Sequence, residues 1–163
     1  MNICTYKTNI GEITIASENG AITILKRSNS ENPASRIPAD VASFSPSPSE
    51  LTNRAAKQLE EYLAGERQEF DVPILPKGTK FQRSVWKALM TIPYGETRSY
   101  KQIAQMLGKP NAPRAVGLAN NKNPIWIIIP CHRVIGSNGS LVGYGGGLEM
   151  KEKLILLESE TRR

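Results

Sequence analysis

The sequence predicts an α+β protein of two units, and three observations support this. Apolar and polar residues alternate near the N-terminus, amphipathic helical patterns with capping signals follow, and the charge balance changes near residue 78. Residues 1–78 carry 8 basic and 10 acidic side chains, whereas residues 79–163 carry 13 and 5. We therefore expect an N-terminal α+β domain over 1–78 and a basic, mainly helical domain over 79–163.

The N-terminal stretch from Tyr6 to Ser28 predicts a hairpin or a small antiparallel sheet. Isoleucines alternate with polar residues on both sides of the Glu-Asn-Gly turn at 18–20, which is typical of strands with one buried face. Over residues 28–50, Ser and Pro supply 11 of 23 positions, so we expect a surface loop. The stretch Ser47–Glu50 then reads as a capping box that starts a helix ending near Gly65.

Three helix starts are predicted in the second domain. Residues 79–82 and 99–102 form capping boxes, and Asn111 is the candidate cap of a third helix. Gly108 closes the helix before it, so two short helices joined by a Gly-containing turn match the helix-turn-helix pattern. The last of these helices is unusually thin because it carries Ala115 and Gly117 among other small residues. It is suited either to a nucleic-acid groove or to close packing against another helix.

The segment after these helices contains the candidate catalytic residues. Ile125–Ile129 is apolar at every position and predicts a short buried strand that leads into Pro130 and Cys131. The run Gly143–Gly147 predicts a tight loop. A final helix follows, with Met150, Leu154 and Leu157 expected on its apolar face.

Composition and charge limit the function classes. The longest apolar stretch is far shorter than the roughly 20 residues needed to cross a bilayer, so we expect no membrane insertion. Two cysteines form at most one disulfide, and the N-terminus lacks a charged and apolar leader, so we expect the protein in the reducing cytoplasm. We also expect a monomer. The basic second half favours a polyanionic partner, although many proteins with basic halves bind nothing charged.

Cys131 is followed by His132, the chain's one histidine. Such a pair is often a small buried hydrophobe beside a core imidazole. A zinc site is not expected, because zinc needs four ligands and the other cysteine is at position 4. Adjacent side chains diverge, so a thiol and an imidazole here need a bridging water. Glu158, four residues after Leu154, is a candidate acceptor for the other ring nitrogen, with solvent exposure as its ordinary alternative.

The motif Pro130-Cys131-His132-Arg133-Val134 closely resembles the signature of the O6-alkylguanine-DNA alkyltransferases. The resemblance is strong over about residues 79–160 and weaker before them. It implies a ribonuclease-H-like N-terminal domain and a winged-helix-like active-site domain. It also implies that Cys131 removes an alkyl group from guanine O6, and possibly thymine O4, in duplex DNA and keeps it as a thioether in a single turnover. No cofactor or metal is implied.

The same resemblance assigns further roles. His132 reaches Cys131 through a water and Glu158 orients His132, while Asn123 tethers the turn before the active-site segment. Tyr100 lies at the target phosphate and assists the departing guanine. Arg114 is the finger that replaces the extruded nucleotide in the stack. The DNA contacts are expected from Arg114, Tyr100, Ala115 and Lys151, and the guanine pocket from Val134, Tyr144 and Gly145.

Gly145 departs from the pattern of relatives that carry a serine there, so we expect a more open pocket with less support for the oxygen. Two other functions stay open on the residues alone. One is a winged-helix DNA-binding or regulatory module in which Cys131 is structural. The other is a cysteine hydrolase that uses Cys131 and His132, although hydrolase pairs usually come from separate segments.

Overall fold

The computed structural model describes residues 1–28, 37, 41, 45–141 and 147–162, and the chain divides into two compact units. The first unit is Met1–Lys77 with Pro124–Trp126, and the second is Gly78–Asn123 with Ile127–Arg163. The predicted α+β class is confirmed, because strands dominate the first unit and helices the second. The division falls between 77 and 78, where we predicted 78 and 79, and the short segment 124–126 joins the first unit. Most of the predicted 28–50 loop lies outside the described residues.

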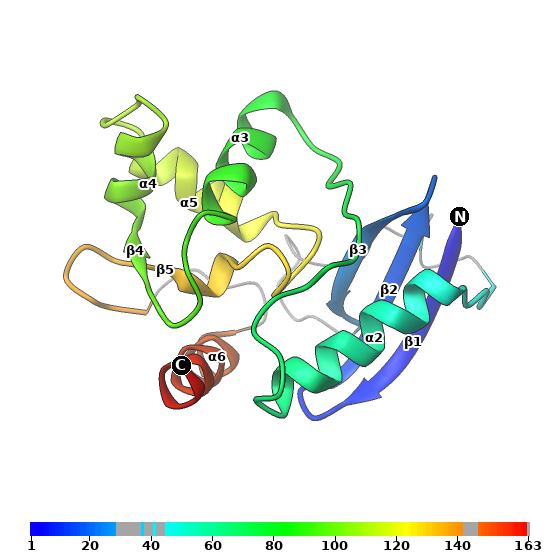
Figure 1. The fold of residues 1–163 in the computed structure, drawn as a ribbon. Helices are drawn as coiled ribbons and strands as arrows, with labels where there is room; N and C mark the ends of the chain where they lie inside the picture. The colour runs from blue at the N-terminus through cyan, green and yellow to red at the C-terminus, as the bar shows by residue number, and fades with distance from the viewer. Residues whose placement is uncertain (29–36, 38–40, 42–44, 142–146, 163) are drawn as a thin grey trace. The chain divides into compact units, whose positions relative to one another are not determined.

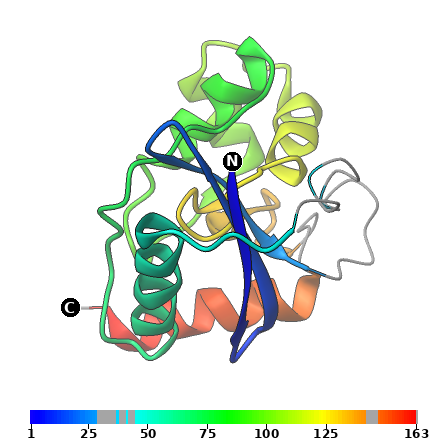
Figure 2. The ribbon, with the colours of Figure 1, turned by 90° about the vertical axis from the view of Figure 1, so that its right-hand side faces the viewer.

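Within the described residues, the first unit is a three-stranded antiparallel sheet covered by helix α2 (Glu50–Leu63). Strands β1 (Asn2–Thr8), β2 (Gly11–Glu18) and β3 (Ala21–Arg27) pair in chain order, and α2 packs against all three (Figure 1, Figure 2). Asn19 and Gly20 have φ of 51° and 78°, as the tight turn between β2 and β3 requires. The shared core is fully buried and includes Ile13, Ile15, Ile22, Leu25, Ala55, Leu59 and Tyr62.

Helix α2 begins two residues later than predicted. Ser49, not Ser47, is the N-cap, and its Oγ accepts a hydrogen bond from the Thr52 amide at 3.1 Å. Thr52 Oγ1 in turn accepts from the Ser49 amide at 2.9 Å. Ser47 is engaged elsewhere, because its amide donates to the Ile3 carbonyl at 2.7 Å and its Oγ accepts from the Ile3 amide at 3.2 Å.

The second unit contains four α-helices, a 3₁₀ turn and a two-strand pairing within the described residues. Helices α4 and α5 lie side by side, and both contact α3 (Figure 1). Strands β4 and β5 pair in parallel, with Arg98 opposite Val134. The elements are α3 (Lys80–Leu89), β4 (Arg98–Ser99), α4 (Tyr100–Met106), α5 (Pro113–Asn121), the 3₁₀ turn η2 (Cys131–Arg133), β5 (Val134–Ile135) and α6 (Leu148–Thr161).

The capping boxes predicted at Thr79 and Ser99 are confirmed at α3 and α4. Gly108 follows the end of α4 with φ of 70°, as predicted for a residue that closes a helix. The predicted cap at Asn111 is wrong. Ala112 is the N-cap of α5 and makes no side-chain hydrogen bond, because Pro113 at the first helical position already presets the helical φ.

The predicted strand over Ile125–Ile129 does not form, although all five residues are buried. Ile127 has φ of 72°, which turns the chain in the middle of the run. Ile125 forms an isolated parallel bridge with Leu25, and the Trp126 amide donates to the Leu25 carbonyl at 2.8 Å. An apolar run indicates that its residues are buried, but it does not determine whether they form a strand or a turn.

Helix α6 buries polar residues that we expected at its margin or on the surface. Met150 and Leu154 are buried as predicted, but Leu157 is only partly buried. Lys151 and Glu158, with exposures of 0% and 1%, complete the buried face. None of the helices in the described ranges has the length and apolar character of a membrane span.

Candidate active site

Cys131 begins the short turn η2 and is buried, with 2% exposure. Its amide donates to the Ile129 carbonyl at 2.8 Å, and its carbonyl accepts from Asn120 Nδ2 at 3.3 Å. The turn contacts α3 and α6. The thiol is therefore held by backbone hydrogen bonds in the interior of the second unit, whereas we expected it at the end of a strand.

His132 and Glu158 form a buried contact, with His132 Nε2 lying 2.7 Å from Glu158 Oε2. Both side chains are almost fully enclosed. Burial lowers the pKa of His132, and it outweighs the opposing effect of the Glu158 carboxylate. This shift favours the uncharged imidazole. Because Nε2 is directed at Glu158, Nδ1 is the ring nitrogen that this carboxylate does not engage.

Glu158 accepts hydrogen bonds from two segments, the η2 turn and the chain around Gly95. Burial alone would raise the pKa of its carboxyl, but hydrogen bonds from His132 and Arg133 outweigh it and lower the pKa to about 2. The Gly95 amide also donates to Oε1 at 3.2 Å. Arg133 lies within the signature motif, but its role could not be predicted from the sequence. The structure makes it the charged partner of Glu158.

Tyr100 and Lys151 lie on a second side of the site. Tyr100 is the first residue of α4, and Lys151 Nζ lies 5.7 Å from the centre of its ring. Burial and the nearby Cys131 raise the pKa of Tyr100 to about 12, with Asn120 acting in the opposite direction. Burial also lowers the pKa of Lys151 to about 8, and Cys131 opposes that shift. Both values reflect a poorly hydrated environment.

The expectation that Lys151 contacts DNA is wrong for this structure. Its side chain is fully buried, so it presents no charge at the surface. Its ammonium instead faces Tyr100 and the region of Cys131. A fully buried lysine is rare unless it is paired.

Two asparagines hold the segments around Cys131. Asn123 is fully buried, and its Nδ2 donates to the Ile129 carbonyl at 2.8 Å, which closes the turn that follows α5. Asn120, which sequence analysis did not select, is also buried and reaches the Cys131 carbonyl. Its burial could have been predicted from its helical spacing relative to Val116 and Ala119, the other buried residues of α5.

The opposite side of α5 is exposed. Arg114, Leu118 and Lys122 follow one another at four-residue intervals and are all exposed, so they lie along one face of the helix. Leu118 is 66% exposed. Ala115 is half-buried beside this face.

Of the three residues predicted to line the guanine pocket, the structure describes only Val134. Val134 is fully buried in β5, immediately after the η2 turn. Tyr144 and Gly145 lie outside the described residues. Within the parts of the chain that are described, no three or more His, Cys, Asp or Glu side chains gather as a metal site would require.

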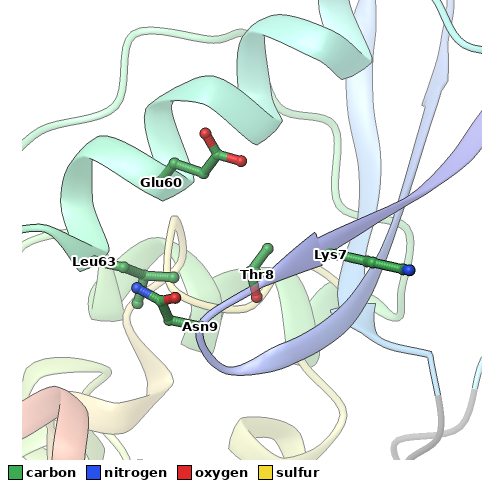
Figure 3. Close-up of a pocket in the computed structure, with 5 residues that line it drawn as sticks. All are labelled: Lys7, Thr8, Asn9, Glu60 and Leu63. Carbon is green, nitrogen blue, oxygen red and sulfur yellow. The ribbon is translucent and has the colours of Figure 1, made fainter.

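A pocket also exists in the first unit, and Figure 3 shows its lining. Glu60 and Leu63 come from α2, and the other residues come from the end of β1 and the turn after it. The Lys7 side chain points away from Glu60 in this view. None of the candidate active-site residues lies in it. Its lining is Lys7, Thr8, Asn9, Glu60 and Leu63.

Fold and site together define a two-unit α+β protein with a buried cysteine, backed by histidine and glutamate, in its helical unit. Two family models match the chain. The 6-O-methylguanine DNA methyltransferase ribonuclease-like domain matches residues 2–76, and the DNA binding domain of the same family matches residues 80–160. The chain belongs to the 6-O-methylguanine DNA methyltransferase family, which confirms the resemblance found in the sequence.

Individual relatives agree with this assignment. A methylated-DNA–protein-cysteine methyltransferase of Mycobacterium bovis is 49% identical over 94% of this chain and 90% of its own length. The Methanosarcina barkeri protein of the same name is 63% identical over 67% of this chain and 69% of its own length. A crystal structure of Mycobacterium tuberculosis OGT in complex with DNA superimposes with a TM-score of 0.87 at 46% identity, covering 99% of this chain and 94% of that one.

Proposed function

We propose that this protein repairs DNA by moving an alkyl group, typically methyl, from guanine O6 in duplex DNA to Sγ of Cys131. The observation that carries the proposal is the buried Cys131 followed by a His132 whose imidazole contacts Glu158. Family membership and the names of the relatives support the reaction type. The product is a thioether, which has no easy hydrolytic exit, so each molecule acts once.

In the proposed step the Cys131 thiol loses its proton to His132 through a water as sulfur attacks the alkyl carbon. The new S–C bond forms while the C–O6 bond breaks, and the electron pair of that bond stays on guanine. A proton then returns to the guanine ring, so the base leaves neutral. The Tyr100 hydroxyl stays protonated at physiological pH because its pKa is about 12, and it can donate a hydrogen bond to the departing base.

Base flipping follows from the burial of the nucleophile. Cys131 is 2% exposed, so it cannot approach O6 while the base is stacked in a duplex. The exposed face of α5 supplies a DNA contact of suitable charge, with Arg114 as the finger that fills the vacated place in the stack. Asn123 holds the turn between that helix and the active-site segment.

The proposal also covers the finer expectations from the resemblance. Val134, Tyr144 and Gly145 line the guanine pocket, and the pocket also accepts thymine alkylated at O4. Ala115 allows close approach of α5 to the DNA. The protein acts as a monomer in the cytoplasm and needs no cofactor.

Intact-mass measurement after mixing with O6-methylguanine duplex DNA tests the proposal. We expect the mass to rise by one methyl group, with peptide mapping placing it on Cys131 and with one base repaired per protein molecule. Cys131→Ser should lose transfer but keep DNA binding, because the thiol supplies reactivity and no groove contact. Repeated turnover by a small amount of protein would contradict the single-turnover mechanism. Tight lesion binding with no mass gain would instead favour a non-catalytic DNA-binding module.

The relay has its own test. His132→Ala and Glu158→Gln should slow alkylation of Cys131 at neutral pH, because the thiol then lacks its oriented proton acceptor. The measurement is the rate of reaction with free O6-benzylguanine as a function of pH. Glu149→Gln, an exposed change on the same helix, is the control. Unchanged pH profiles in both variants would reduce Glu158 to a purely structural residue.

A further inference from the structure

Arg133 is held in one orientation by three buried hydrogen bonds. Its Nε donates to Glu158 Oε1 at 2.8 Å, and its Nη2 donates to Glu158 Oε2 at 3.0 Å. Its Nη1 donates to the Ile92 carbonyl at 2.7 Å. The guanidinium also lies 5.6 Å from the centre of the Tyr94 ring. This two-point geometry is specific to arginine, since a lysine ammonium cannot span both carboxylate oxygens with a planar fork.

The same carboxylate serves the imidazole. Glu158 Oε2 accepts both from Arg133 Nη2 and from His132 Nε2, so the two basic side chains share one negative charge. Lys151 is a second cation that acts on the imidazole. His132 therefore faces one carboxylate and two cations.

This arrangement has a definite effect on the proton. A buried carboxylate alone beside an imidazole stabilises the imidazolium form, which has no lone pair with which to accept another proton. A guanidinium bound to that carboxylate cancels much of this attraction. The carboxylate then still orients the imidazole ring, but it no longer strongly favours the protonated imidazolium form.

We propose that Arg133 is a positioning residue that acts together with burial to keep the His132 imidazole neutral and therefore able to accept the Cys131 proton. It acts through Glu158, which it fixes by two hydrogen bonds and whose charge it balances. This inference rests on the proposed function for its consequence, because the neutral imidazole matters only if the thiol gives up its proton to it. A merely structural ion pair would leave the ionisation of His132 unchanged.

The test uses the fact that the chain has one histidine, so its imidazole gives one set of resonances in an NMR titration. Arg133→Met should raise the titration midpoint of His132 by at least about one pH unit, because the uncompensated Glu158 then favours the imidazolium. The acidic limb of the rate of reaction with O6-benzylguanine should move to higher pH by a similar amount. Arg133→Lys keeps the charge and should leave the midpoint near that of the wild type.

Two controls make the result decisive. Arg98→Met removes a partly exposed arginine of the same unit, paired with Glu96, and should not move the midpoint. If Arg133→Met does not fold, Arg133→Gln replaces it, because glutamine removes the positive charge but keeps an amide donor for the Glu158 carboxylate. Loss of the cation should again raise the midpoint. An unmoved midpoint in whichever comparison folds overturns the proposal.

The outcome is separable from the proposed function. The His132 midpoint is measured without DNA, whereas alkyl transfer is measured as a mass gain on Cys131. A raised midpoint without any mass gain in the wild type would support the role of Arg133 in setting the imidazole charge and reject the transfer reaction. A mass gain on Cys131 with an unmoved His132 midpoint would support the transfer reaction and reject the role of Arg133.

Discussion

His132 and Glu158 are 26 residues apart in the chain, yet Nε2 of the first lies 2.7 Å from Oε2 of the second in the interior of the helical unit. The contact joins the η2 turn to α6. Because Arg133 binds the same carboxylate, Glu158 joins these two segments as well as taking part in the proposed proton relay. Its ionisation should therefore contribute to stability.

Glu158 should make folding sensitive to acid. Its pKa is about 2 in the folded protein against 4.5 for an ordinary glutamate, so its ionisation stabilises the fold above about pH 4.5. This contribution, about 3 kcal/mol, is lost as the pH falls from about 4.5 toward 2. Glu158→Gln should therefore lower Tm at pH 7, and the difference from the wild type should shrink over that acid range.

Thermal unfolding monitored by circular dichroism across this range measures the effect. Glu149→Gln is the matched control, since that carboxylate is 85% exposed and its Tm difference should be near zero at every pH. If the Tm of Glu158→Gln stays below that of the wild type by a constant amount down to pH 2, the low pKa assigned to Glu158 is contradicted.

Lys151 should weaken the fold while promoting the reactivity of the thiol. Its pKa of about 8 lies below the ordinary 10.5, so the folded protein disfavours the ammonium. The resulting penalty develops as the pH falls from 10.5 to 8 and is complete below it. Lys151→Met should therefore raise Tm at pH 7, with the gain disappearing toward pH 10.5. It should also slow Cys131 alkylation at pH 7, because a nearby cation favours the thiolate.

The control for Lys151 is Lys153→Met on the same helix, where the side chain is 69% exposed. That change should leave both Tm and the rate of reaction with O6-benzylguanine close to the wild type. If the two methionine variants behave alike, the buried ammonium has no special effect on the site.

Arg114 should act on extrusion of the base and not only on charge. Arg114→Ala should slow repair of O6-methylguanine in duplex DNA at least about ten-fold more than reaction with free O6-benzylguanine, because unstacking costs a few kcal/mol and the finger offsets part of it. Lys122→Ala removes one charge from the same exposed face. Both variants should reduce the log–log salt dependence of binding by about one unit, but only Arg114→Ala should show the rate difference. Equal slowing of both substrates by Arg114→Ala would assign Arg114 to the fold of the pocket.

Leu118 should contribute apolar contact to DNA between the two cations. Leu118→Ala removes about 1 kcal/mol of the binding free energy that comes from burying the side chain, so affinity for duplex DNA should fall about five-fold. The reaction with free O6-benzylguanine should not change. Leu156→Ala, at a leucine of α6 that is 53% exposed, serves as the control and should bind DNA normally. Fluorescence anisotropy with labelled duplex DNA gives both affinities, and equal affinities would exclude Leu118 from the interface.

Local signals were sufficient for much of the fold. The β2–β3 turn, the boxes at Thr79 and Ser99 and the glycine after α4 act over a few residues, so each could be predicted from neighbouring side chains. Cys131 and His132 were also found in this way, because they are adjacent in a distinctive motif. The partner at Glu158 was reached from the spacing along its own helix.

Longer-range packing decided the rest. Ser47 bonds to β1 and leaves the cap to Ser49, and Ile127 turns where an apolar run predicted a strand. Arg133 and Lys151 carry charges that ordinarily lie in water, so their burial depends on partners distant in the sequence. A capping box or an alternating strand acts within one turn or one hairpin, and the sequence therefore determined those elements. The charge balance around His132 depends on three segments meeting in the interior, the η2 turn, α6 and residues 92–95, and only the tertiary structure could decide it.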